Sequence, residues 1–169
     1  WCHEGQRMFQ ATQSCAGLPN ANEMSWYAVK GNPRWDRDEL WTTMGHLYKG
    51  GMWFKKKSVL QAEGNYSTEK SADRSTDLRT TASRAYDNSA GSIAYGGLPS
   101  PADADKYFYL PALGLYGNGT LNQVGIYGRY WSSTASFSNG SYELKFNELG
   151  VEMNDYTPRV IGARVGSFQ

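Results

Sequence analysis

The side chains that could support catalysis or hold a metal are few and widely separated along the chain. His3 and His46 are the only histidines, and neither belongs to a spaced cluster of His, Cys and carboxylates. The motifs Gly-x-Ser-x-Gly and Gly-x-Gly-x-x-Gly are absent, as is a Walker loop. The sequence therefore predicts a protein that is not an enzyme and that uses no metal and no cofactor.

Two pairs of carboxylates, Asp36 with Asp38 and Asp103 with Asp105, could in principle serve glycoside hydrolysis. We interpret both as structural. The first pair, followed by Glu39, stands where a helix is expected to begin, and carboxylates there complement the helix dipole. The second pair falls in a turn rich in Pro and Ala.

The charge balance excludes whole classes of partner. Lys and Arg number 17 against 16 acidic residues, so no strong overall field would attract nucleic acid or an anionic membrane. The run 55–57, three lysines, is interpreted as the solvated end of a strand. There is no long apolar run, so we expect no insertion into a membrane. With 40% hydrophobic and 20% charged residues, the 169-residue chain predicts a single globular domain.

Aromatic residues and glycines are unusually frequent, with 12 Tyr, 6 Trp and 19 Gly. Tyrosine on turns offers contact area at low entropic cost, which is typical of binding surfaces. Tyr127, Phe137 and Tyr156 stand in turns rich in Gly, Ser or Asn, where a side chain would face solvent. We predict that such rings stack on sugar faces or on side chains of a partner.

Cys2 and Cys15 could close a short N-terminal loop, and in an oxidising compartment a disulfide of that span would contribute about 3 kcal/mol. Two unpaired thiols remain the alternative. The sequence starts at Trp1 without a signal peptide, from which we expect a processed or excised portion of a longer exported protein.

Two helices are predicted in the first part of the chain, about 1–60. Asn20 and Glu23 have the spacing of a capping box, and 31–33, Gly-Asn-Pro, should end that helix. A second helix is predicted from Asp36 to Gly50-Gly51, with His46 at its boundary or in the core. Its apolar residues have helical spacing: Leu40, Trp41, Met44, Leu47 and Tyr48. A buried strand, 52–54, should follow.

The rest of the chain predicts a long irregular region, about 61–106, and then a sheet, about 107–169. In the irregular region we expect four anchors in the core: Leu78, Tyr86, Ile93 and Tyr95. Tyr142, Leu144 and Phe146 alternate with Glu143, Lys145 and Asn147, so the first three should face the core, as should Trp131. Gly150 permits a turn into a paired strand with Val151 and Met153 inward and Glu152 and Asn154 outward, and a final strand is expected over 161–165. The order predicts an α+β fold.

Several motifs in this chain resemble bacterial C-type lectin-like surface domains of the Fibrobacter succinogenes major paralogous domain group. The motifs are Leu110-Pro111-Ala112, the Gly-rich stretch to Gly128, Tyr130-Trp131-Ser132-Ser133-Thr134, Tyr142-x-Leu144-x-Phe146, Arg159-x-x-Gly162-x-x-Val165, and the helix start Leu18-Pro19-Asn20-Ala21-Asn22-Glu23. Together they cover about half of the chain. The Glu-Pro-Asn and Trp-Asn-Asp signatures of calcium-dependent lectins are absent. The Cys pair of the related formylglycine-generating enzymes is also missing from the C-terminal half.

The resemblance implies a C-type lectin-like fold, in which two helices pack on a small antiparallel sheet and a long loop region carries binding. Some relatives, including target proteins of diversity-generating retroelements, display variable residues on their final strands and turns. The matching positions here, as ligand-binding residues, are Tyr127, Arg129, Phe137, Asn139, Lys145, Asn147, Glu152, Asn154, Tyr156 and Arg159.

From the turns and the resemblance together we expect an extracellular recognition module at a bacterial cell surface, such as an adhesin or receptor-binding domain. Its partner would be a glycan or a protein on another cell or host surface. The alternative is a structural subunit or packing domain of a larger cell-surface or pilus assembly.

Overall fold

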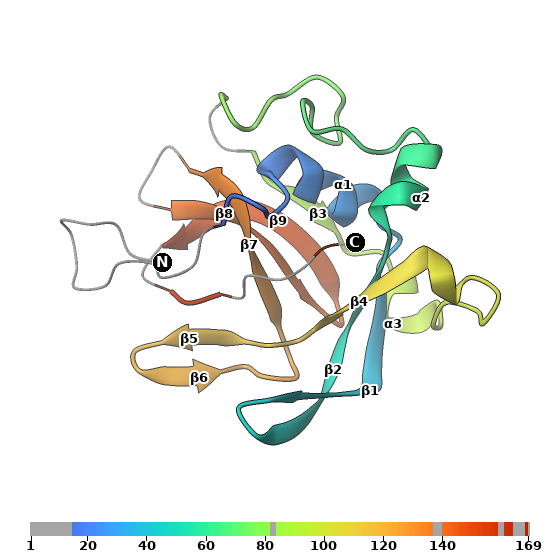
Figure 1. Cartoon of the computed structure of the whole chain (residues 1–169), viewed down its shortest axis with the longest axis vertical. Helices are drawn as coiled ribbons and strands as arrows, with labels where there is room; N and C mark the ends of the chain where they lie inside the picture. The colour runs from blue at the N-terminus through green and yellow to red at the C-terminus, as the bar shows by residue number, and fades with distance from the viewer. Residues whose placement is uncertain (1–14, 82–83, 137–139, 159–160, 164–167, 169) are drawn as a thin grey trace.

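The computed structural model describes residues 15–81, 84–136, 140–158, 161–163 and 168. Within them lie three helices, α1 (Ala21–Lys30), α2 (Lys57–Ala62) and α3 (Ser92–Tyr95), and one 3-10 turn, η1 (Ala104–Lys106). The strands are β1 (Arg34–Thr43), β2 (His46–Lys55), β3 (Tyr86–Asn88), β4 (Tyr107–Pro111), β5 (Leu115–Gly117), β6 (Thr120–Asn122), β7 (Gly128–Ala135), β8 (Gly140–Asn147) and β9 (Gly150–Pro158). The chain is mostly β-structure (Figure 1).

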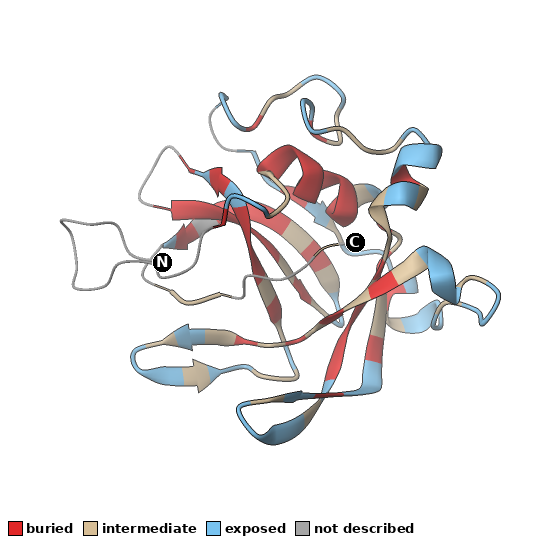
Figure 2. Ribbon diagram, in the orientation of Figure 1, coloured by how far each residue is buried: buried red, intermediate tan, exposed pale blue. Residues whose placement is uncertain are grey.

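The predicted architecture of two helices on a small sheet is wrong. The strands form two antiparallel sheets, one in the order β1-β2-β4 (sheet A) and one in the order β3-β9-β8-β7 (sheet B), with a separate β5-β6 ribbon. Among the described residues only one helix, α1, is longer than six residues, and it packs against the strands of sheet B. Figure 2 shows α1 and the middle of sheet B as the most buried parts of the molecule.

The first helix forms as predicted. The Asn20 side chain accepts a hydrogen bond from the Glu23 N–H, and the Glu23 carboxylate accepts one from the Asn20 N–H. The helix ends at Gly31, but the residue in the left-handed region is Asn32, with φ of 45°. Gly31 itself has φ of −65°, and a Cβ there would stand 2.2 Å from the Tyr27 carbonyl oxygen. Glycine is therefore required at 31 for space and not for left-handed backbone geometry.

The predicted second helix is a β-hairpin made of β1 and β2. Trp41 pairs with Tyr48 across the hairpin, and their rings stack with centroids 5.2 Å apart. The turn is Met44-Gly45, with φ of 50° and 79°, a conformation that matches the twist of paired strands. The Asp36 carboxylate accepts from the N–H groups of Asp38 and Glu39, as a helix cap would, but here it stabilises an irregularity in β1. The hydrogen-bond pattern expected at the start of a helix therefore occurs within a β-strand.

This hairpin changes the setting of two residues considered above. His46 was expected at a helix boundary or in the core, but it lies exposed on β2. Asp36 was expected to cap a helix, yet it is buried within sheet A and accepts a hydrogen bond from the Trp53 indole at 3.0 Å. The predicted strand 52–54 is confirmed as part of β2, which pairs with β4.

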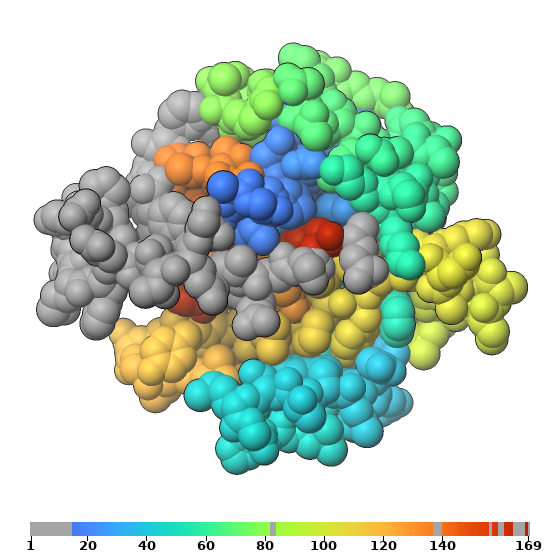
Figure 3. All heavy atoms as spheres, in the orientation of Figure 1, coloured from blue at the N-terminus to red at the C-terminus, as the bar shows by residue number. Residues whose placement is uncertain are grey.

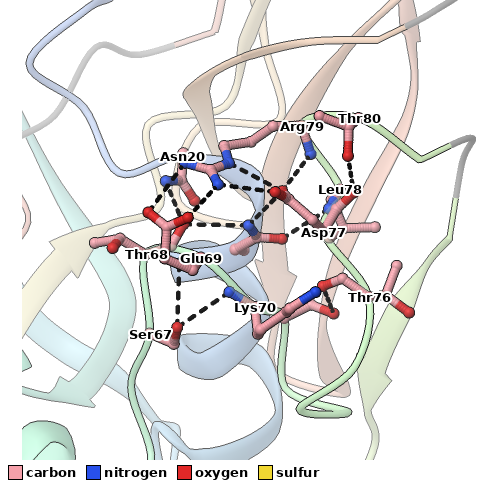
Figure 4. Close-up of polar contacts among 12 residues, drawn as sticks. Asn20, Ser67, Thr68, Glu69, Lys70, Thr76, Asp77, Leu78, Arg79 and Thr80 are labelled. Carbon is pink, nitrogen blue, oxygen red and sulfur yellow. Dashed lines mark hydrogen bonds and ion pairs between the residues drawn. The ribbon is translucent and has the colours of Figure 1, made fainter.

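The irregular region is ordered by polar contacts around residues 65–81, which we call the polar loop. The buried Asn22 amide donates to the Thr68 carbonyl and to Asp77, and its oxygen accepts from the Leu78 N–H. Figure 4 shows the surrounding contacts, in which Arg79 bridges Asp77 and Glu69. Figure 3 shows the polar loop (green) and the β1–β2 hairpin (cyan) at opposite ends of the molecule.

Of the four expected anchors in the irregular region, Leu78, Tyr86 and Ile93 are confirmed as buried. The prediction that Tyr95 is buried is wrong, since its side chain is 88% exposed. It ends the four-residue helix α3, which contacts β1 but leaves that ring in solvent.

The core joins the two sheets and α1. The strand alternation on β8 and β9 is confirmed for the inward side, because Tyr142, Leu144, Phe146, Val151 and Met153 are all buried. Trp131 is buried too, but it pairs with Glu143 and so lies on the opposite face of sheet B from Leu144. Phe54 of sheet A meets Phe146 of sheet B edge to face, with centroids 5.6 Å apart. Of the predicted final strand, the described part, 161–163, makes one isolated bridge, from Gly162 to Tyr116.

Candidate functional site

The loop before β7 holds Tyr127 against both sheets. Gly125 donates to the Ala112 carbonyl, and Gly114 donates to the Tyr127 carbonyl. Gly50 of β2 has φ of 96°, and a Cβ on it would stand 2.7 Å from the Gly125 carbonyl oxygen. Only glycine allows this approach of loop and strand. Tyr127 is therefore fixed in backbone position while its side chain remains half-buried.

The turn between β8 and β9 forms the opposite wall. The Asn147 side chain accepts hydrogen bonds from the N–H groups of Leu149 and Gly150, at 2.8 and 3.1 Å, and so shapes its own turn. Leu149 is 70% exposed at the tip. An apolar side chain held out in a rigid turn is available for contact with a ligand.

Two hollows meet at this place. The larger hollow, of about 630 Å³, lies between sheet A, the loop and the turn, and the smaller hollow, of about 260 Å³, lies beside β3 and β9. Both are lined by Tyr127, Asn147 and Leu149. The larger is completed by Trp35, Arg37, Lys49, Gly125, Ile126 and Glu148, and the smaller by Asp87, Asn88, Ser89, Lys145, Phe146, Gly150, Val151 and Glu152. Volumes of this order suit small ligands or parts of larger ones.

Most charges around the hollows are paired. Arg37 reaches Glu148 across the rim of the larger hollow at 3.5 Å, and Lys49 reaches Asp38 at 3.4 Å. In the smaller hollow, Lys145 reaches Glu152 at 3.2 Å. These pairs lie at the surface, where each adds at most about 1 kcal/mol to stability. Their main effect is to leave little net charge facing a ligand.

The structure brings together four of the predicted ligand residues. Tyr127, Lys145, Asn147 and Glu152 all line one or both hollows. Phe137, Asn139 and Arg159 lie outside the described residues, as does the side chain of Tyr156. Cys2, the other half of the expected disulfide, is also outside them, while Cys15 is buried.

Two predicted ligand residues, Arg129 and Asn154, lie away from the hollows. Asn154 was expected to face outward but is 4% exposed, and Glu143, also expected outward, is 1% exposed. Arg129 forms an ion pair with Glu143 at 2.9 Å, and Thr157 also donates to that carboxylate. Alternation alone failed here because it assumes that one face of the sheet is solvated, whereas this part of the outer face of sheet B is covered.

Burial governs the chemistry of Glu143. It raises the pKa of this carboxyl, although Arg129 and Thr157 oppose the rise. One of its oxygens, Oε2, has no hydrogen-bond partner among the described residues, and neither does Nε of Arg129. This buried pair is a structural feature of sheet B with unused hydrogen-bonding capacity.

Three of the four carboxylates considered for hydrolysis, Asp36, Asp38 and Asp103, have structural partners. Asp103 accepts from the Ser100 hydroxyl and pairs with Lys106, whose ammonium lowers the pKa of Asp103. The lysines of 55–57 are also partly engaged, because Lys55 pairs with Glu63 and Lys57 with Glu23. Among the described residues, no group of three or more His, Cys, Asp or Glu side chains could hold a metal ion.

The sequence analysis did not predict the other residues that line the hollows. Arg37 was predicted in a helix, Trp35 just before the start of that helix, and Asp87 in an irregular segment. Ile126 and Leu149 did carry a signal. Each is a large apolar residue beside a turn glycine, with exposures of 58% and 70%, where a polar residue would normally stand.

Comparisons with known proteins give no relative for this chain. No family model, no curated protein and no solved structure matches it. In the described part of the chain no helix has the length and apolar character needed to cross a membrane.

Proposed function

We propose that this chain is a non-catalytic recognition module of a bacterial cell surface, which binds a glycan or a protein of another cell or host through the two hollows. The observation that carries the proposal is the convergence of four residues, predicted from the sequence as ligand contacts, on hollows that share Tyr127. Exposed apolar side chains in rigid turns add contact area that need not be ordered on binding, which lowers the entropic cost.

The arrangement supports binding better than bond breaking. The hollows contain aromatic rings, two side-chain amides and ion pairs, but Asp87 and Glu152 sit among paired or solvated groups. A catalytic acid or base needs a pKa moved toward neutrality, and Glu143, a described carboxyl whose pKa burial raises, lies away from both hollows. Contact area and hydrogen bonding are what this site can offer.

The test is an array that carries purified oligosaccharides and purified cell-surface proteins, probed with the chain and with Tyr127→Ala. We expect the wild type to bind at least one probe and Tyr127→Ala to bind it at least tenfold more weakly, about 1.4 kcal/mol or more. Tyr95→Ala is the matched control, because Tyr95 is 88% exposed and lines neither hollow.

The unfolding free energy of both variants should stay within about 1 kcal/mol of the wild type. If Tyr127→Ala unfolds the domain, the ring belongs to the core, and Ile126→Ser then tests the same hollow from an exposed position. Binding that survives all of these changes, or no binding by the wild type, contradicts the proposal.

A second candidate function has its own observation. Leu40, Met44 and Leu47 are 60%, 76% and 64% exposed on the β1–β2 hairpin, and Met44 is in the left-handed region, which is costly for a side chain with a Cβ. An apolar hairpin of this kind favours a packing domain in a larger surface or pilus assembly. That function predicts self-association in gel filtration, abolished by Leu40→Ser with Leu47→Ser, and array binding unaffected by Tyr127→Ala.

A further inference from the structure

We infer that the ligand unit held at Tyr127 is an uncharged sugar residue. This inference rests on the proposed function and specifies its chemistry. Three properties of the hollows lead to it: their shape, the pairing of their charges, and the hydrogen-bonding groups that the pairing leaves over.

Shape favours a compact unit over the face of a folded protein. A protein partner of ordinary affinity covers about 800 Å² on each side, usually over a wide surface. Here the contact residues surround two adjoining hollows of about 630 and 260 Å³ that share one wall. Successive units of a chain molecule, one on each side of Tyr127, fit this division.

Charge pairing reduces what an anionic ligand could gain from the cations at the hollows. Each cation at the hollows has an acid within 3.5 Å: Arg37 with Glu148, Lys49 with Asp38, and Lys145 with Glu152. A sulfated or carboxylated ligand would have to break one of these pairs to gain its own. A neutral ligand leaves all three in place and gains contact with the rings and alkyl groups between them.

The hydrogen-bonding groups left over in the smaller hollow include the Asp87 carboxylate and the Asn147 amide nitrogen. Asp87 is exposed, and its carboxylate makes no hydrogen bond or ion pair with any described residue, so it can accept two hydroxyl protons. The amide nitrogen of Asn147 is also without a partner among the described residues, because only its oxygen is used by the turn. Sugar hydroxyls both donate and accept, so a sugar in this hollow can bond to the carboxylate and to the amide N–H group, which both line it.

Aromatic and aliphatic surface completes the match. Tyr127 and Trp35 line the larger hollow with Ile126 and Leu149. The C–H faces of a sugar ring are apolar and pack on such side chains, while its hydroxyls point outward to polar groups. The hollows offer both kinds of contact within one site.

The experiment uses an array of three matched sets: neutral oligosaccharides of hexoses and N-acetylhexosamines, sialylated or sulfated oligosaccharides, and deglycosylated purified cell-surface proteins. We expect binding to members of the neutral set, unchanged within about twofold between about 50 and 500 mM NaCl, because no ion pair with the ligand is screened. Asp87→Asn keeps the shape of the side chain and should weaken that binding about tenfold, since a hydrogen bond to a charged group is lost. Asp105→Asn, on exposed η1 and away from both hollows, is the control.

The outcomes separate the two proposals. Binding confined to protein spots or to acidic oligosaccharides, and lost in Tyr127→Ala, overturns the neutral sugar and leaves the recognition site standing. Neutral-sugar binding that Asp87→Asn does not weaken also overturns the assignment of Asp87. No binding by the wild type, or binding indifferent to Tyr127→Ala, overturns both.

Discussion

The polar loop and the outer face of sheet B each contain a carboxylate shielded from water, and the two have opposite hydrogen-bonding environments. In the polar loop, Asp73 accepts hydrogen bonds from the Ser71 and Thr76 hydroxyls and from the N–H groups of Ser75 and Thr76. On sheet B, Glu143 is more deeply buried and has one oxygen without a partner among the described residues. The first arrangement uses up its hydrogen-bonding capacity, and the second does not.

The two carboxyls consequently have opposite pKa shifts. Burial raises the pKa of Asp73 in isolation, but the hydrogen bonds from Thr76, Ser75 and Ser71 outweigh it and hold the pKa well below its usual range. Burial raises the pKa of Glu143, and the contacts with Arg129 and Thr157 are too few to reverse it. In the polar loop the Asp73 carboxylate is fully hydrogen-bonded. On sheet B, Glu143 and Arg129 each have a buried polar atom without a hydrogen-bond partner among the described residues.

Asn22→Ala should have the largest effect on stability. The Asn22 side chain is fully buried and joins α1 to the polar loop through Thr68, Asp77 and Leu78. Its loss leaves several buried polar groups without partners, at a cost of about 3 kcal/mol. The free energy of unfolding in urea measures this, with Asn122→Ala on the exposed β6 as the control. A change as small as that of the control would show that the loop contributes little to the fold.

Asp73→Asn should have the next largest effect, with a defined pH dependence. A carboxyl whose pKa is lowered on folding stabilises the protein above its unfolded pKa and loses that contribution as the pH falls. We expect the variant to be about 2 kcal/mol less stable than the wild type at neutral pH. The gap should narrow as the pH falls below about 4, the unfolded pKa of Asp. Parallel urea titrations across pH measure the gap, and a gap independent of pH would contradict the assignment.

Glu143→Gln should show a smaller effect of opposite sign with pH. Because the pKa of Glu143 is raised on folding, the folded protein binds the proton more tightly than the unfolded chain does. The wild type should therefore gain stability relative to Glu143→Gln as the pH falls from neutral toward about 4.3, the unfolded pKa of Glu. If the wild type instead loses stability relative to the variant over this range, the ion pair with Arg129 outweighs burial. The contrast with Asp73 would then disappear.

The sequence predicted well those features that depend on neighbours in the chain. The capping box at Asn20 and Glu23 formed as expected, because its hydrogen bonds join residues three positions apart. The inward residues of β8 and β9 were also predicted, since alternation fixes which side chains share a face. Four of the ligand positions that the resemblance implied, on β8, β9 or the loop before β7, also line the hollows.

The secondary-structure prediction failed where the same local sequence pattern is compatible with both a helix and a β-hairpin. Leu40, Trp41, Met44 and Leu47 have helical spacing, but the same residues suit a hairpin once Met44-Gly45 adopts a left-handed turn and Trp41 stacks on Tyr48. Local energies differ little between these forms, and pairing of β2 with β4, more than fifty residues later, favours the hairpin.

By itself, then, the sequence determined the short-range features: the start of α1, the alternation of the C-terminal strands and the aromatic turn at Tyr127. Only the tertiary structure decided that residues 34–55 are strands, that Glu143 and Asn154 are covered, and that two hollows form where Tyr127 meets the β8–β9 turn. The reason is physical. Burial and pairing between distant segments depend on which surfaces meet, and no spacing within one segment specifies its partner.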